Sequence, residues 1–145
     1  MMTPSELWTG ILAMERAYAA CRREVTETFR LTAAEFDVLL FLANNEERDT
    51  AADIVRMRKI PKSQVSLAVN ALIGRGLLTG EHRPGDRKSV HLQPTAAAGP
   101  IVAAGRAAQE RFAARLFGAL TEEEKEQFIA LQRRMIAAIA AGEEQ

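Results

Sequence analysis

Residues 76–95 constrain the fold of this chain more than any other stretch. They read Gly-Leu-Leu-Thr-Gly-Glu-His-Arg-Pro-Gly-Asp-Arg-Lys-Ser-Val-His-Leu-Gln-Pro-Thr. Two short apolar runs flank a tip in which adjacent Pro84 and Gly85 predict a tight reversal of the chain. After the tip, Val90 and Leu92 alternate with polar residues, which is typical of a half-buried strand. The segment therefore predicts a β-hairpin with a cationic tip.

The charge distribution points to an anionic partner for this hairpin. The chain has no net charge, but residues 1–47 carry −4, residues 48–91 carry +5 and the remainder carries −1. Cations crowded at a hairpin tip repel one another, and apposed phosphates would relieve that repulsion. The pattern favours a nucleic-acid partner, and a solvated basic face without a partner is the alternative.

Length and composition indicate one globular domain. A chain of 145 residues with 48% hydrophobic and 26% charged residues is ordinary for such a domain. No apolar run approaches the roughly 20 residues of a membrane span, and no basic region precedes an apolar stretch at the N-terminus. The single cysteine, Cys21, fits a reducing compartment. We expect a cytoplasmic protein without a membrane partner.

Threonine capping boxes predict where several helices begin. Thr3, Thr32 and Thr121 are each followed three residues later by glutamate, and Thr50 is followed by Asp53 in a weaker version of the same pattern. Helices should therefore begin near residues 4, 32, 50 and 121. The expected helical spans are about 4–28, 33–44, 50–58, 61–74, 100–118 and 122–141.

The spacing of apolar residues indicates which helices form the core and which carry apolar stripes that must pack against something else. The helix at 33–44 is apolar nearly all round, while Ile54, Met57, Val65, Ala68, Val69, Leu72 and Ile73 should face the same core. The first helix carries an apolar stripe made of Leu7, Ile11, Met14, Tyr18, Cys21 and Val25. The last carries one made of Phe128, Leu131, Met135, Ile136 and Ile139. These stripes should pack on a second copy of the chain, and a three-helix cap within one chain is the alternative.

Two short helices followed by a hairpin resemble a winged helix-turn-helix, and the chain as a whole resembles the MarR family (multiple-antibiotic-resistance regulators). The resemblance rests on Gly-Leu-Leu at 76–78, on Asp86-Arg87-Lys88, on the alternating strand at 89–92 and on Pro94-Thr95. It implies a mainly α fold with a small β-hairpin wing. Within a single domain, 1–145, about 31–95 would form the DNA-binding lobe, and about 4–28 and 100–141 the dimerisation helices.

Two sets of side chains are candidates for DNA contact. Helix periodicity turns one set outward at the start of the recognition helix, where residues reach base edges: Lys62, Ser63, Gln64, Ser66, Leu67 and Asn70. The second set would contact phosphates or form the wing: Arg56, Arg58, Lys59, Arg75, Arg83, Asp86, Arg87 and Lys88. In the resembling family, the wing aspartate holds a neighbouring cation, a role that we carry to Asp86 with Arg87 or Lys88.

Other reactive residues predict no catalytic or metal chemistry. Cys21 lies on an apolar stripe, where an unactivated thiol is expected. His82 and His91 lack a third ligand for zinc and are predicted to be surface or phosphate contacts. No catalytic triad, phosphate loop or metal spacing is present in the sequence. We therefore expect no enzyme activity, no cofactor and no metal.

The resemblance implies a sequence-specific transcriptional regulator. Such a protein would be a homodimeric repressor that reads a pseudo-palindromic operator and is released by a small-molecule inducer. Its partners would be double-stranded DNA, a second copy of itself and that inducer. The residues of the ligand pocket, the operator and the inducer are left open. A winged-helix protein–protein adaptor that does not bind DNA is the alternative.

Overall fold

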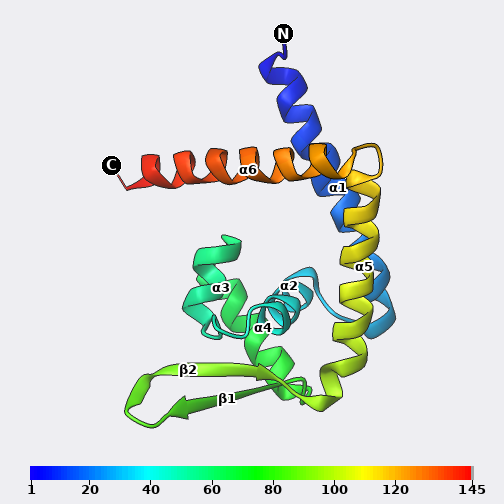
Figure 1. Cartoon of the computed structure of the whole chain (residues 1–145). Coiled ribbons are helices and arrows are strands. Elements are labelled where there is room, and N and C mark those ends of the chain that lie inside the picture. Colours follow the sequence, from blue (N-terminus) through cyan, green and yellow to red (C-terminus); the bar gives the residue numbers. More distant parts are fainter. Residues whose placement is uncertain (145) are drawn as a thin grey trace. The chain divides into compact units, whose positions relative to one another are not determined.

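The structure is a computed structural model that describes residues 1–144 (Figure 1). Its elements are α1 (Pro4–Phe29), α2 (Ala33–Asn44), α3 (Ala51–Arg58), α4 (Lys62–Gly74), β1 (Leu78–Arg83), β2 (Asp86–Pro94), the 3₁₀ turn η1 (Ala96–Ala98), α5 (Gly99–Phe117) and α6 (Glu122–Glu143). The predicted class, mainly α with one β-hairpin, is confirmed. The chain forms two compact units, Met1–Glu110 and a second that begins at Arg111.

Threonine caps set the starts of four helices. Thr3, Thr32, Thr50 and Thr121 each accept a hydrogen bond from the backbone N–H three residues later, and each of those residues returns a carboxylate to the cap. The weaker pattern at Thr50, with aspartate in place of glutamate, forms a full box as well. Satisfying these otherwise unpaired donors explains why the predicted starts agree with the structure to within one residue.

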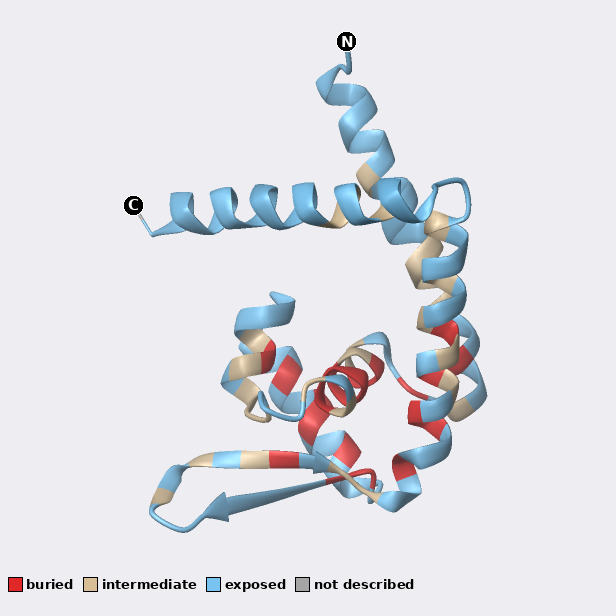
Figure 2. Cartoon of the chain, in the orientation of Figure 1, coloured by how far each residue is buried: buried red, intermediate tan, exposed pale blue. Residues whose placement is uncertain are grey.

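Helix α2 forms the centre of the first unit. Phe36, Val38 and Leu39 have no exposed surface, and the next three residues are at most 2% exposed. Helix α2 packs against α1, α4 and β2, and Figure 2 shows the buried residues gathered on α2, on the facing side of α4, at the inner end of the hairpin and on α5. The core is completed by Ile54, Val65, Leu72, Leu78, Leu92, Ile101 and Val102. The predicted burial of α2 is thus confirmed.

Three residues that the sequence predicts to be buried or half-buried are instead at the surface. Met57 and Ile73 are each 41% exposed, and each lies near the C-terminal end of its helix. Val90 is 42% exposed, because only the inner end of the hairpin, at Leu78 and Leu92, lies on the core (Figure 2).

The hairpin has the predicted tight tip. Strands β1 and β2 are antiparallel, with Thr79 opposite Gln93 and Glu81 opposite His91, and the register shifts between Glu81 and Arg83. Pro84 and Gly85 form the turn, and the backbone φ of Gly85 is +84°. In a type II turn, proline occupies the first central position and the second takes a positive φ, which glycine adopts without steric cost.

The apolar faces of α1 and α6 each carry large exposed side chains among residues 1–144. In α1, Leu7 and Trp8 are more than half exposed. No residue of α6 is buried, and Leu131, Met135 and Ile139 lie along one stripe with more than half of their surface exposed. At the start of α6, Phe128 meets Phe117 edge-to-face, with ring centroids 5.6 Å apart. Within residues 1–144, no helix combines the length and the apolar character needed to cross a membrane.

We predict that Gly105→Ala destabilises the first unit although alanine is the better helix former. A Cβ at Gly105 would lie 2.7 Å from Cδ2 of Leu40, a side chain that is only 1% exposed and has no space to move away. Overpacking of this kind costs about 1–3 kcal/mol of unfolding free energy. Urea unfolding measures the change. Gly142→Ala is the control, because a Cβ there meets nothing within 4 Å and stability should not fall.

Candidate nucleic-acid interface

Helix α4 presents a row of polar side chains that have no partner among the described residues, 1–144. Val65, Ala68, Val69 and Leu72 face the core, which turns the opposite side of the helix outward. That side is the recognition surface, defined by Lys62, Ser63, Gln64, Ser66, Leu67 and Asn70, all of them exposed. Among residues 1–144, the five polar members make no side-chain hydrogen bond or ion pair with one another or with other residues. Leu67 is 72% exposed, which is unusual for a leucine.

The turn between α3 and α4 sets the orientation of the recognition surface. Lys59 ends α3 in the left-handed conformation (φ 55°), and its N–H donates to the carbonyl of Val55. Ile60 is half-buried and Pro61 is the N-cap of α4, without a side-chain hydrogen bond. Pro61 thus offers the N–H groups at the start of α4 no side-chain partner, and the N-terminal end of a helix favours an anion.

The arginines of α3 already have intramolecular partners. The Arg58 guanidinium stacks over the Phe41 ring, 4.9 Å from its centroid. Arg56 pairs with Asp53 at 2.9 Å, one turn earlier on the same helix. An exposed pair of this kind contributes little stability, so Arg56 can exchange Asp53 for a phosphate. Arg58 is held more firmly, because its cation rests on an aromatic face.

Arg75, which is predicted to contact a phosphate, has partners within the chain. Its Nη2 donates to the carbonyl of Phe29 at 2.9 Å and its Nη1 to that of Arg30 at 3.0 Å. The last carbonyls of a helix lack intrahelical partners, and a cation there is favoured by the helix dipole. Arg75 therefore caps α1 and ties the end of α4 to it.

At the wing tip, two cations, Arg87 and Lys88, have no partner among residues 1–144. Both are exposed, and neither makes a side-chain hydrogen bond or an ion pair within the described chain. Arg83, predicted to belong with them, instead pairs with Asp49 at 2.8 Å.

The predicted salt bridge from Asp86 to Arg87 or Lys88 does not form. Asp86 Oδ1 accepts from the backbone N–H groups of Lys88 and Ser89, at 3.3 and 3.2 Å, so this carboxylate holds the turn. Its Oδ2 lies 3.4 Å from Nε2 of His91. The hydrogen bonds from Ser89 and His91 hold the pKa of Asp86 below its ordinary value.

The two histidines of the hairpin have different roles. His82 is exposed, and its Nδ1 lies 3.1 Å from the carbonyl oxygen of Ser89. His91 is only 16% exposed, with Nδ1 2.7 Å from Oδ1 of Asp49, so the predicted surface role is wrong for this residue. Sequence reasoning missed Asp49, although an acid directly before a helix cap, inside a basic segment, was a signal. Residues 1–144 contain no group of three or more side chains that could hold a metal ion.

Comparisons with known proteins agree with the winged-helix fold of this lobe. Residues 31–89 match the model of the MarR family. The match spans α2, α3, α4 and most of the hairpin, so this lobe resembles that of MarR-family proteins. Among curated proteins, no sequence matches it.

Solved structures of MarR-type proteins match nearly the whole chain. BpsR of Bordetella bronchiseptica, whose DNA binding is regulated by 6-hydroxynicotinic acid, is 25% identical, with 90% of this chain and 98% of BpsR covered and a TM-score of 0.70. S. aureus MepR in its DNA-binding conformation is 22% identical, with coverages of 95% and 99% and a TM-score of 0.79. MepR in its complex with DNA is 21% identical, with 94% of this chain and 96% of MepR covered and a TM-score of 0.74. The family matched by residues 31–89 consists of DNA-binding transcriptional regulators rather than enzymes.

We predict that Arg75→Gln lowers stability but leaves the salt dependence of DNA binding unchanged. The variant loses two charge-assisted hydrogen bonds to the end of α1, which should cost about 1 kcal/mol of unfolding free energy at this exposed position. If Arg75 contacted a phosphate, the slope of log K against log salt would instead fall by about one. Thermal melting and titrations at several salt concentrations separate the two roles. Arg87→Gln is the control, expected to lower the slope without lowering the melting temperature.

Proposed function

We propose that this chain is a homodimeric, sequence-specific repressor that reads a pseudo-palindromic operator and is released by a small ligand. The observation that carries the proposal is the recognition surface of α4, whose exposed polar side chains have no partner within residues 1–144. These polar side chains can bind a ligand without first breaking hydrogen bonds within the protein. A helix of this size fits the major groove of DNA.

Within the recognition surface, each side chain suits a particular contact. Gln64 can bind an adenine edge through two hydrogen bonds, and Lys62 can reach a guanine edge or a phosphate. The hydroxyls of Ser63 and Ser66 can bond to bases or phosphates. Leu67 is suited to contact with a thymine methyl group, which would explain its exposure. Asn70, one turn further along, would extend the contact.

The wing and α3 would supply the contacts that do not depend on sequence. Arg87 and Lys88 are exposed at a narrow tip and suit insertion into the minor groove, where A·T-rich stretches attract cations. Arg56 and Lys59 would contact phosphates beside α3. Asp86 would contribute indirectly, by holding the turn that carries both tip cations.

The uncovered apolar faces of α1 and α6 support dimerisation. Trp8 on α1 and Met135 on α6 are each more than half exposed, and each lies on a long helix. A second copy would bury each stripe against its counterpart. Two recognition helices about one turn of DNA apart would then read the halves of a pseudo-palindrome.

A cavity beside the turn that precedes α4 is a candidate ligand site. It has a volume of about 320 Å³ and is lined by Tyr18, Asp37, Leu40, Phe41, Asn44, Arg58, Ile60 and Gln109. Two aromatic rings, two amides and the Arg58 cation suit an aromatic carboxylate, the chemical class to which the effector of BpsR belongs. Arg22 pairs with Asp37 at 2.8 Å, while burial raises the pKa of that carboxyl. A ligand against Arg58 and Ile60 would bias the position of α4 by binding one arrangement better.

Charge distinguishes this function from that of a protein–protein adaptor. An apolar adaptor interface gives no reason to hold Arg87 and Lys88 unpaired at the wing tip. Binding to phosphates also weakens steeply with salt, because it releases counterions from DNA, whereas an apolar protein interface responds little.

We predict tight, salt-sensitive binding to DNA upstream of the chain's own gene, measured by fluorescence anisotropy beside scrambled DNA. Arg87→Ala should weaken binding to both DNAs by a similar factor, because a wing cation reads no base. Gln64→Ala should reduce the difference in affinity between the upstream and the scrambled DNA, because a lost bidentate contact costs about 1–3 kcal/mol of discrimination between bases.

Equal affinity of both variants and the wild type would place the interface elsewhere. Failure of the wild type to bind either DNA at low salt would favour the adaptor.

A further inference from the structure

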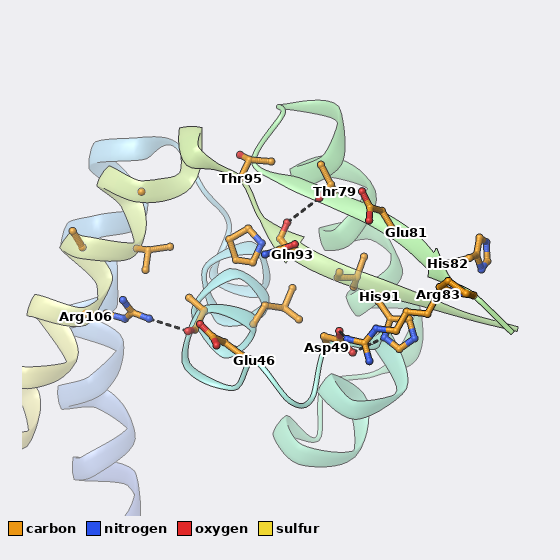
Figure 3. Close-up of a pocket in the computed structure, with 18 residues that line it drawn as sticks. Glu46, Asp49, Thr79, Glu81, His82, Arg83, His91, Gln93, Thr95 and Arg106 are labelled. Atoms are coloured by element: carbon orange, nitrogen blue, oxygen red, sulfur yellow. Dashed lines mark hydrogen bonds and ion pairs between the residues drawn. The ribbon is translucent and has the colours of Figure 1, made fainter. Parts of the chain in front are cut away.

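Asp49, in the loop between α2 and α3, holds both strands of the wing. Its Oδ2 accepts from Nη2 of Arg83 on β1 at 2.8 Å, and its Oδ1 lies 2.7 Å from Nδ1 of His91 on β2. Its backbone carbonyl accepts from the N–H of Leu92 at 2.8 Å. Figure 3 shows the Arg83 and His91 side chains converging on Asp49, which is only 14% exposed. One residue thus joins the hairpin to the loop at three points.

The next residue connects this junction to the DNA-binding helices. Thr50 is the N-cap of α3, and its hydroxyl exchanges hydrogen bonds with Asp53. Since α3 packs on α4, the position of Asp49 is fixed relative to the recognition surface. A displacement of the wing therefore requires the Asp49 contacts to break, or α3 to move.

The outer half of the hairpin has little else to hold it. Apolar contact with the core ends at Leu78 and Leu92, and Val90 is largely exposed opposite a glycine-containing stretch of β1. Beyond that point, His91 continues the chain of contacts to Asp86, and Asp86 holds the turn at Lys88 and Ser89. The polar path from Asp49 through His91 to Asp86 therefore ends at the two tip cations.

An acid at this place is unfavourable for DNA binding by charge alone. Asp49 lies in the segment of the chain with net charge +5, on the loop beside the wing, where a negative charge repels phosphates. We propose that Asp49 is the positioning residue of the wing, which sets where Arg87 and Lys88 meet the DNA relative to α4. The inference rests on the proposed DNA-binding function.

Substitution by asparagine separates positioning from charge, because the two effects have opposite signs. Asp49→Asn keeps the size of the side chain but removes the charge that pairs with Arg83. If only charge mattered, DNA binding would tighten. If Asp49 positions the wing, affinity for the upstream and scrambled DNAs should fall by about three- to tenfold, the range typical of coupled contacts.

Glu47→Gln is the matched control. It removes the same charge two residues away, from an exposed side chain that makes no hydrogen bond or ion pair with the rest of residues 1–144. Its DNA affinity should stay the same or rise slightly. His91→Gln is a second variant, which breaks the β2 contact without removing an acid, and it should weaken binding as Asp49→Asn does.

A double-mutant cycle with Arg87→Ala tests whether Asp49 affects DNA affinity through the cations of the wing tip. If Asp49 acts by placing the tip cations, Asp49→Asn should weaken binding much less in the Arg87→Ala protein than in the wild type. Additive losses would overturn the proposal, because they would mean that Asp49 acts independently of the wing tip. Tightening by Asp49→Asn would overturn it directly.

Hydrogen exchange of the free, full-length protein tests, without DNA, whether Asp49 holds the hairpin in place. Asp49→Asn should speed exchange in residues 86–93 and leave α2 and α6 unchanged, with thermal melting confirming that the variant is folded. Unchanged exchange in the hairpin would overturn the inference. A wild type that binds no DNA overturns the proposed function and this inference together, whereas normal wild-type binding with tightening by Asp49→Asn overturns the inference alone.

Discussion

The burial of α2 on nearly every side is the constraint on which the DNA-binding lobe depends. Because α2 is apolar almost all round, α1, α4, β2 and the first part of α5 must each turn an apolar face toward it. For α4, that requirement decides which residues face outward, so the recognition surface is a consequence of core packing. The same packing leaves α5 so close to α2 that only glycine fits at position 105 opposite Leu40.

The cations of the lobe divide into those that hold the structure and those that are free to bind. Arg75 caps α1, Arg58 rests on Phe41 and Arg83 pairs with Asp49. Arg87 and Lys88 have no such partner within residues 1–144. Net positive charge therefore overstates the number of side chains available to phosphates. The carboxylates Asp49 and Asp86, which charge alone would exclude from a DNA-binding face, serve the geometry of the wing.

Local signals predicted the fold well, because helix starts and the hairpin turn depend on a few neighbouring residues. The threonine boxes and the Pro84-Gly85 turn are examples, and the outward side of α4 followed from its periodicity. The roles of Arg75, Arg83 and His91 could not be predicted in this way. Each depends on a partner more than 30 residues away, and sequence spacing carries no information about such pairs.

The central claim is that α4 and the wing tip bind DNA in adjacent grooves as one rigid unit. Hydroxyl-radical footprinting of the wild type and Arg87→Ala on the same upstream DNA tests it most directly, with guanine methylation to report on the major groove. The account predicts that both proteins protect the major groove at the same positions. It also predicts that the flanking minor-groove protection is lost in Arg87→Ala. Identical minor-groove footprints for the two proteins would contradict it.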